Sequence, residues 1–128
     1  MKHIPTIAGA LLGLVFVTFG LDHFLGFLPK PPGPAEGSPA ALFFGAIFPT
    51  GFFSMVKVCE ITGGLLVALP KTRNLGLLIL GPIIVNILGF HTFIGDRSNL
   101  LSPPVLAISV LGASLLWCGR RKFAALLN

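Results

Sequence analysis

Residues 4–28 have the sequence IPTIAGALLGLVFVTFGLDHFLGFL, in which Asp22 and His23 are the only ionisable side chains. An α-helix rises about 1.5 Å per residue, so this run is long enough to cross a hydrocarbon core of about 30 Å. It is also longer than the hydrophobic core of a signal peptide, and the small-x-small site at residues 38–40 lies far beyond its end. We therefore predict an uncleaved membrane-spanning helix.

The composition of the whole chain agrees with a membrane protein. Only 10% of its 128 residues are charged, against roughly a quarter in soluble domains, and the mean hydropathy is +0.93. A soluble domain of this length buries too little of its surface to hide so much apolar area. The net charge of +5 does not indicate nucleic-acid binding, because the basic residues stand at the ends of apolar runs.

Apolar runs long enough to span a membrane occur four times in the chain. They cover about residues 4–28, 52–69, 75–94 and 100–119. We predict an all-α membrane protein, a four-transmembrane-helix bundle in which residues 1–128 form a single membrane domain.

The connection between the first two spans, residues 29–51, is predicted to be an outer loop with a short helix. Its first part, PKPPGP, stops the first span because proline lacks the backbone donor that a helix needs. Ser38 followed by Pro39 is typical of a helix start. The run AALFFGAIF that follows is too short to span the membrane. We predict that it forms a re-entrant or interfacial helix.

The basic residues predict the orientation of the chain in the membrane. On one side of the predicted spans lie six of them, Lys2, Lys71, Arg73, Arg120, Arg121 and Lys122. Only Lys30 and Arg97 lie on the other side. Because cytoplasmic loops carry an excess of Lys and Arg, we predict a multi-pass protein of the plasma (inner) membrane with both termini in the cytoplasm.

Polar side chains from all four predicted spans fall at one depth, in the outer half of the bundle, when the helix rise is used to place them. They are Asp22, His23, Lys57, Glu60, Asn86, His91 and Ser109. All phenylalanines but Phe123 lie at mid-depth or farther outward. Ionisable residues inside a span are costly and indicate function, and an aromatic cavity with few polar groups is typical of a small-molecule site. We predict a cavity for a quinone or a similar apolar ligand.

Roles in this predicted cavity follow from the chemistry of the side chains. Glu60 and His91 are expected to transfer protons, and Lys57 to stabilise a developing oxyanion. Asn86 is expected to hydrogen-bond a ligand carbonyl. The remaining predicted ligand-binding residues are Asp22, His23, Phe19 and Phe90.

Helix geometry supports some of these groupings better than others. Lys57 and Glu60 are three residues apart, so they share a helix face and can form an ion pair. Asp22 and His23 differ by about 100° around the helix axis, and Asn86 and His91 by about 140° on an ideal helix. A shared depth therefore does not by itself place either of the last two pairs in one pocket.

Each feature also has a plainer interpretation. The Lys57–Glu60 pair can be a buried ion pair that only fixes helix packing, and the phenylalanines can simply fill the core. His23 and His91 are more often interhelical hydrogen-bonding residues than ligands, so a bis-histidine haem is disfavoured and no metal site is predicted. Gly9 and Gly13 form a small-xxx-small pair that predicts close helix contact, within the chain or in a homodimer.

The chain resembles the DoxX-like family of small four-helix membrane proteins. The similarity rests on FGLDHF at residues 19–24, the proline-rich loop, KVCEITGGL at residues 57–65 and PIIVNILGFH at residues 82–91. The resemblance implies a four-helix bundle and links to quinone-coupled thiosulfate oxidation and membrane redox complexes, while distant relatives act as assembly chaperones or cargo receptors. It carries over no established catalytic residue.

These observations favour a membrane subunit of a redox system that binds a quinone or lipid-like ligand and works with a soluble or membrane redox partner. The alternative is a non-enzymatic membrane scaffold or assembly chaperone, in which the polar layer is a structural lock. A small transporter is a weaker alternative, because the chain is short and has no visible inverted repeat. Whether the chain is itself an enzyme is left open.

Overall fold

The computed structural model describes residues 3–30 and 32–127, and all regular secondary structure in these residues is helical. The prediction of an all-α protein is therefore confirmed. Lys2, one of the six basic residues used to predict the orientation, lies outside the described residues.

Four long α-helices and two short ones follow one another along the described part of the chain. They are α1 (Ile4–Leu25), α2 (Pro39–Ile47), α3 (Phe52–Ala68), α4 (Arg73–Gly89), α5 (Pro103–Cys118) and α6 (Arg120–Ala124). A π-helical turn, Phe90–Ile94, continues α4, and two 3₁₀ turns, Arg97–Leu101 and Ala125–Leu127, precede α5 and follow α6. The long helices lie within a few residues of the four predicted apolar runs.

Local sequence explains where the helices begin and end around the first loop. α1 ends at Gly26, which adopts the left-handed conformation (φ 67°) that glycine tolerates best. α2 begins with Ser38, whose Oγ accepts a hydrogen bond from the backbone N–H of Ala41 at 3.2 Å, and with Pro39 in the first turn. The short helix after the proline-rich stretch therefore has the start that the sequence predicts.

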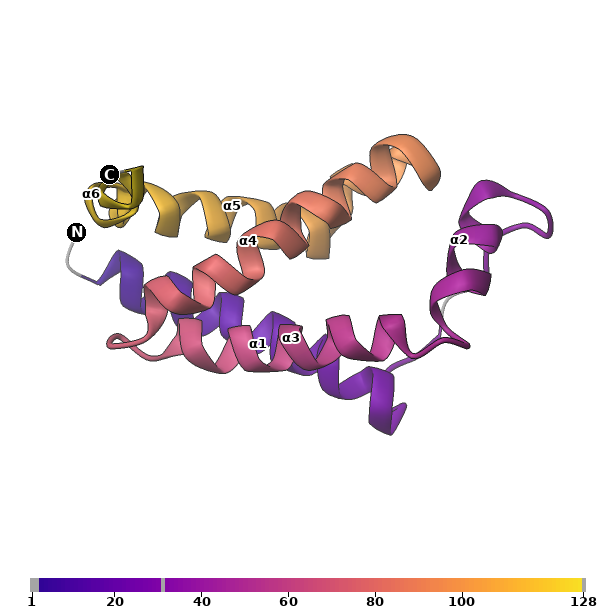
Figure 1. The fold of residues 1–128 in the computed structure, drawn as a ribbon, viewed down its shortest axis with the longest axis horizontal. Helices are drawn as coiled ribbons and strands as arrows, with labels where there is room; N and C mark the ends of the chain where they lie inside the picture. Colours follow the sequence, from indigo (N-terminus) through magenta and orange to yellow (C-terminus); the bar gives the residue numbers. More distant parts are fainter. Residues whose placement is uncertain (1–2, 31, 128) are drawn as a thin grey trace.

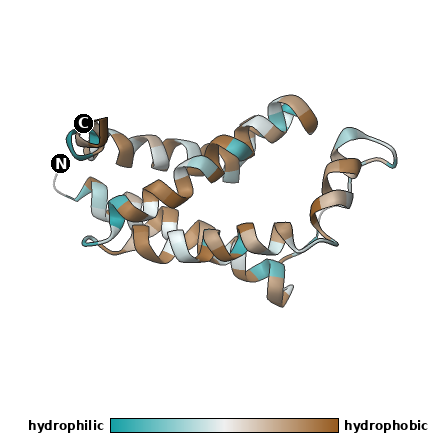
Figure 2. Ribbon diagram, in the orientation of Figure 1, coloured by the Kyte–Doolittle hydropathy of each residue, from teal (hydrophilic) through white to brown (hydrophobic). Residues whose placement is uncertain are grey.

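Two helices of the described chain are long and apolar enough to cross a membrane, namely α1 and the continuous helix Arg73–Ile94. The number rises to four if α2 with α3, bent by 81°, and α5 with α6, bent by 73°, each count as one span. Each long helix also has a large apolar side chain that is more than half exposed: Leu14 (64%), Leu65 (56%), Val85 (68%) and Val110 (62%). Figure 2 shows brown, apolar residues along all four long helices. Such a surface suits lipid rather than water.

The four long helices share one buried core. α1 lies against α3, α3 against α4, and α5 against both α1 and α4, while α2 stands across the end opposite the two termini (Figure 1). Leu12 of α1, Val67 of α3, Leu80 of α4 and Leu115 of α5 are almost completely buried in this core. These four residues lie in the half of the molecule nearer the termini, and the core continues through Phe16, Ile84 and Ile108 toward α2.

Glycines bring α1 and α3 into close contact. A Cβ atom added to Gly13 would lie 2.5 Å from the carbonyl oxygen of Gly64, and one added to Gly9 would lie 2.7 Å from that of Val67. Such distances leave no space for a side chain, so the two backbones touch directly. The sequence left open whether Gly9 and Gly13 make a helix contact within the chain or in a homodimer. In this structure they contact α3 of the same chain.

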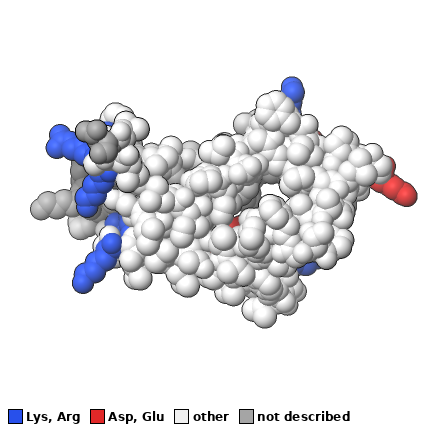
Figure 3. All heavy atoms as spheres, in the orientation of Figure 1, with Lys and Arg blue, Asp and Glu red and all other residues white. Residues whose placement is uncertain are grey.

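Charge is distributed unevenly along the molecule. Figure 3 shows blue, basic side chains gathered at the end where Figure 1 marks the two termini. Arg73 at the start of α4 and Arg120, Arg121 and Lys122 in α6 lie at this end. The basic cluster expected from the sequence is thus assembled at one end of the described fold.

Candidate functional site

A cavity of about 560 Å³ lies between the long helices, on the side of the core away from the termini. All four long helices, α2 and the π-helical turn contribute to its lining. Figure 3 shows this face of the molecule hollowed near its middle, with red carboxylate atoms visible inside, and Glu60 is the acidic residue of the lining. Its volume is within the range of pockets that bind small molecules.

Aromatic side chains form much of the cavity wall. Seven phenylalanines line it, Phe16, Phe19, Phe43, Phe44, Phe52, Phe53 and Phe90. Phe44 of α2 has its ring centroid 5.2 Å from that of Phe90 and 6.0 Å from that of Phe53 of α3. These contacts fit the offset and edge-to-face packing that aromatic rings prefer. α2 is therefore held over the cavity by aromatic contacts to both sides of it.

Lys57 and Glu60 form an ion pair in the wall of the cavity. The lysine Nζ lies 3.3 Å from each carboxylate oxygen, and the two side chains are 15% and 6% exposed. Nζ also lies 4.9 Å from the ring centroid of Phe53, which adds a cation–π contact. Glu60 is the one buried charged residue in the described chain. The predicted pairing on one helix face is present, and both groups border the cavity.

Asn86 and His91 both line the cavity, although an ideal helix would separate them by about 140°. The helix changes character between them, because the π-helical turn begins at Phe90. Within it, the backbone N–H of Gly95 donates to the carbonyl of Phe90, five residues earlier, at 2.7 Å. The wider turn closes beyond Phe90, so it leaves the angle between Asn86 and His91 largely unchanged. Ile83, Ile87 and Phe90 also line the cavity, and together with Asn86 and His91 they cover one helix face about 140° wide. A π-turn at this position is a common way for a helix to end.

The polar atoms of Asn86 and His91 are only partly used within the protein. Asn86 Nδ2 donates to the carbonyl of Pro82 at 2.8 Å. His91 Nδ1 is buried and has no hydrogen-bond partner among the described residues. A buried polar atom without a partner is costly in a folded protein, and this nitrogen has almost no accessible surface, so it does not open onto the cavity itself.

Asp22 does not line the cavity. Its Oδ1 accepts a hydrogen bond from the backbone N–H of Leu28 at 2.7 Å, and its Oδ2 lies 3.0 Å from Lys30 Nζ. These contacts tie the segment after α1 back onto the last turn of the helix. In the described fold Asp22 thus stabilises the end of α1. It was predicted to bind the ligand, but it is not among the residues that line the cavity.

His23 also lies outside the cavity lining, on the far side of its aromatic wall. Its Nε2 is 3.0 Å from the Ser54 hydroxyl of α3, and its ring packs near those of Phe48 and Phe53. This is the interhelical hydrogen bond that the plainer interpretation of the histidines describes. His23 supports Phe53 from behind and does not reach the same space as His91.

The cavity therefore brings together six of the eight residues singled out in the sequence. They are Phe19, Lys57, Glu60, Asn86, Phe90 and His91. The sequence did not indicate that α2 closes the cavity with Phe43, Phe44 and Ile47, or that Ile108 of α5 forms part of the wall. The two adjacent phenylalanines of α2 were the one available signal, since aromatic residues on a short loop helix need a surface to cover.

No group of three or more His, Cys, Asp or Glu side chains in the described residues is arranged to hold a metal ion. The chain matches no family model, no curated protein and no solved structure. The DoxX-like resemblance therefore stays a prediction from the sequence motifs.

Proposed function

We propose that the chain is a four-span, DoxX-like protein of the plasma membrane that binds a quinone or a similar flat apolar ligand in the cavity beneath α2. It would serve as the membrane subunit of a redox system. The observation that carries this proposal is an aromatic cavity of about 560 Å³ with only four polar lining residues, Lys57, Glu60, Asn86 and His91.

The lengths of the helices support four spans. α3 has 17 residues and α5 has 16, which correspond to about 26 and 24 Å of helix. Both are near the lower limit for crossing a hydrocarbon core. The 81° bend before α3 and the 73° bend after α5 direct α2 and α6 away from the span axes, as expected of interfacial or re-entrant segments. The basic end then lies in the cytoplasm, together with both termini.

The size and polarity of the cavity support a flat, mostly apolar ligand with a few hydrogen-bonding atoms. Seven phenylalanines and several aliphatic side chains offer apolar contact, and the aromatic faces suit stacking on a planar ring. The polar residues come from α3 and from the helix Arg73–Ile94, on different walls. A quinone, whose ring carries carbonyl oxygens on opposite edges, matches this distribution better than a purely aliphatic chain does.

A bound quinone would supply the capacity to accept two electrons and two protons. Asn86 and His91 would hydrogen-bond carbonyl oxygens, and Lys57 would place its positive charge near an oxygen that gains negative charge. Glu60, held next to Lys57, and His91 would carry protons to and from the ligand. The surrounding phenylalanines would keep water away from these groups. The electrons would come from a soluble or membrane redox partner.

A pair of matched substitutions on α3 tests the ligand site. Val56 lines the cavity, while Val58 on the same helix is 52% exposed and does not line it. We expect Val56→Trp to fill the cavity and to weaken binding of a short-tailed quinone at least about tenfold, equivalent to about 1.4 kcal/mol. Val58→Trp, with the same change of side chain, should bind like the wild type. Equilibrium binding to the detergent-solubilised protein measures both, with thermal unfolding as the check on folding.

Two results would overturn the proposal. One is a folded wild-type protein that binds no benzoquinone or naphthoquinone with a short tail. The other is equal binding by both tryptophan variants. Either would favour the scaffold or assembly chaperone, which needs no ligand in the cavity and would be recognised by a membrane protein whose assembly fails when this chain is deleted.

A further inference from the structure

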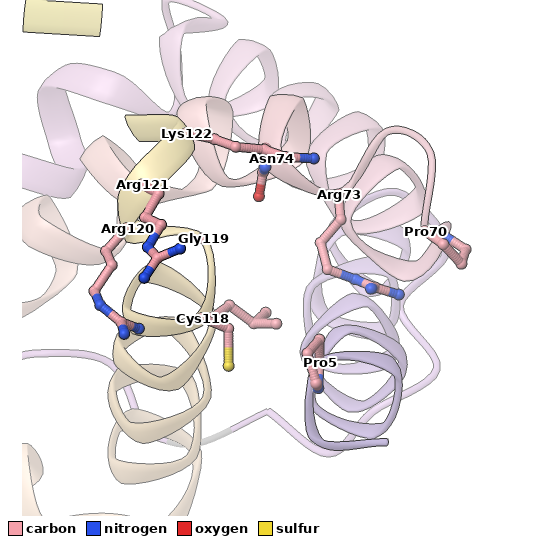
Figure 4. Close-up of a pocket in the computed structure, with 10 residues that line it drawn as sticks. Pro5, Pro70, Arg73, Asn74, Cys118, Gly119, Arg120, Arg121 and Lys122 are labelled. Atoms are coloured by element: carbon pink, nitrogen blue, oxygen red, sulfur yellow. The ribbon is translucent and has the colours of Figure 1, made fainter. Parts of the chain in front are cut away.

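A second cavity, of about 470 Å³, lies at the opposite end of the molecule, where α6 crosses the ends of the long helices. Figure 4 shows it bordered by Arg121 and Cys118 on one side and by Arg73 and Pro5 on the other. Lys122 and Asn74 lie along a third edge (Figure 4). The segments that meet here, at the starts of α1 and α4 and the α5–α6 junction, are distant in sequence.

Four cationic side chains line this cavity, and no acidic side chain does. The chain has four acidic residues, and among the described residues the two ion pairs are Lys30–Asp22 and Lys57–Glu60, which use none of these cations. The positive charge of the cavity is therefore not neutralised by a carboxylate from the described part of the chain. Such a concentration of cations attracts anions.

The four cationic side chains differ in how many contacts they already make within the protein. Arg120 donates to the carbonyl of Trp117 at 2.7 Å and stacks over its ring, with its Cζ 4.3 Å from the ring centroid. Arg73 donates through Nε to the carbonyl of Val67 at 3.2 Å, and its buried Nη2 has no partner in the described residues. Arg121 and Lys122 are exposed and make no side-chain hydrogen bond to a described residue. Arg121 and Lys122 are thus the cations free to bind a ligand.

The position of the cavity indicates which anion it would meet. Trp117, at the end of α5, is 68% exposed. The apolar side chains of Leu126 and Leu127, beyond α6, are also exposed, at 66% and 90%. An exposed tryptophan beside basic residues is typical of the membrane–water interface. α6 is bent by 73° from α5, so in the membrane location proposed above its basic residues would lie across the bundle end at the level of lipid head groups. Apolar side chains next to the cations offer a surface for acyl chains.

We infer that this cavity binds the phosphoryl head group of an anionic phospholipid. Arg121 and Lys122 would contact the phosphate oxygens, with Arg73 adding charge from the opposite wall, and the exposed apolar residues would contact the acyl chains. This inference uses the membrane location proposed above, but it does not depend on a ligand in the aromatic cavity. Basic pockets between membrane helices are suited to anionic head groups.

The test compares two substitutions that remove the same charge at the same end of the molecule. Arg121 lines the cavity, whereas Lys71 is exposed in the α3–α4 turn and does not. Delipidated, detergent-solubilised protein is titrated with phosphatidylglycerol or phosphatidylcholine, and bound lipid is counted by native mass spectrometry. We expect phosphatidylglycerol to bind at least about tenfold more tightly than phosphatidylcholine. Arg121→Gln should weaken phosphatidylglycerol binding about fivefold and Arg121→Gln/Lys122→Gln about twentyfold, whereas Lys71→Gln should change it by less than about twofold.

Three other outcomes of these experiments would each overturn the inference. Equal losses in Arg121→Gln and Lys71→Gln would mean that lipid responds only to the general charge of this end. Equal binding of the two lipids would remove the head-group preference. Inorganic phosphate is added in a separate arm at matched ionic strength. If it binds the lipid-free protein and displaces phosphatidylglycerol, the ligand is a soluble phosphate and the lipid assignment is wrong. Circular dichroism confirms that each variant is folded.

Discussion

The two ends of this helical assembly hold cavities of similar size, about 560 and 470 Å³, but of opposite character. The one beneath α2 is aromatic and contains one cation, Lys57, which is paired with Glu60. The one beside α6 is lined by four cations and, among the described residues, by no carboxylate. Inside an apolar wall a charge is tolerated only with a partner. At the surface, water and lipid head groups can serve as the partner, so unpaired cations persist.

The largest expected difference in stability between variants of the two cavities comes from removing Lys57, the cation of the aromatic cavity. Lys57→Met leaves Glu60 buried without its partner, and we expect a loss of about 3 to 5 kcal/mol in the free energy of unfolding. The double variant Lys57→Met/Glu60→Met removes both charges at similar side-chain volume and should be clearly more stable than the single variant. Unfolding in mixed detergent micelles, followed by circular dichroism, measures both. A single variant as stable as the double variant would mean that the pair is solvated rather than buried.

An intermediate effect is expected at the close contact between α1 and α3, two helices that line the aromatic cavity. Gly13→Ala places a Cβ atom 2.5 Å from the carbonyl oxygen of Gly64, so the helices must separate, at a loss of about 1 to 3 kcal/mol. Gly81→Ala in α4 is the control, because no atom lies within 4 Å of the added Cβ. It should leave the stability unchanged or raise it by up to about 1 kcal/mol. The same unfolding measurement applies, and equal stabilities of the two variants would contradict the close contact.

The smallest effect is expected from removing a cation of the basic cavity. Arg121 is exposed and makes no side-chain hydrogen bond to a described residue, so Arg121→Gln should change the free energy of unfolding by no more than about 0.5 kcal/mol. In lipid-free detergent, relief of repulsion between the neighbouring cations favours a slight gain. A loss comparable to that of Lys57→Met would show that Arg121 has a structural partner, and the contrast between the two regions would fail.

Helix content and helix positions could be predicted from the sequence because they depend on local patterns. Apolar runs of about 20 residues and the Ser38–Pro39 start of α2 each act on their own segment. The exact end of α1 was not predicted, because the prolines from residue 29 were expected to stop the helix and the structure ends it at Leu25, before Gly26. The Lys57–Glu60 pair could also be predicted, since residues three apart on a helix share a face whatever surrounds them. These features need no knowledge of how the helices pack.

The site itself was harder to predict because it depends on contacts between segments that are distant in the sequence. Asn86 and His91 stand at the two edges of one helix face, and whether both border the cavity depends on how much of that face the neighbouring helices leave uncovered. Asp22 and His23 share the depth of the polar layer, yet the loop beyond α1 and Ser54 of α3 occupy their side chains. The depth of a residue along a helix follows from the residue count. Which neighbours its side chain meets depends on how the helices pack, and the spacing of residues in the sequence does not reveal this.

The central claim is that the cavity beneath α2 takes a flat apolar ligand, and photolabelling with a short-tailed azidoquinone tests it most directly. The detergent-solubilised protein is irradiated with the probe, and labelled positions are mapped by mass spectrometry. We predict labelling within residues 43–47 and 83–91, removed by excess unlabelled quinone and by Val56→Trp. Labelling confined to exposed positions such as Leu14 and Val110, or labelling that unlabelled quinone does not reduce, would contradict the claim.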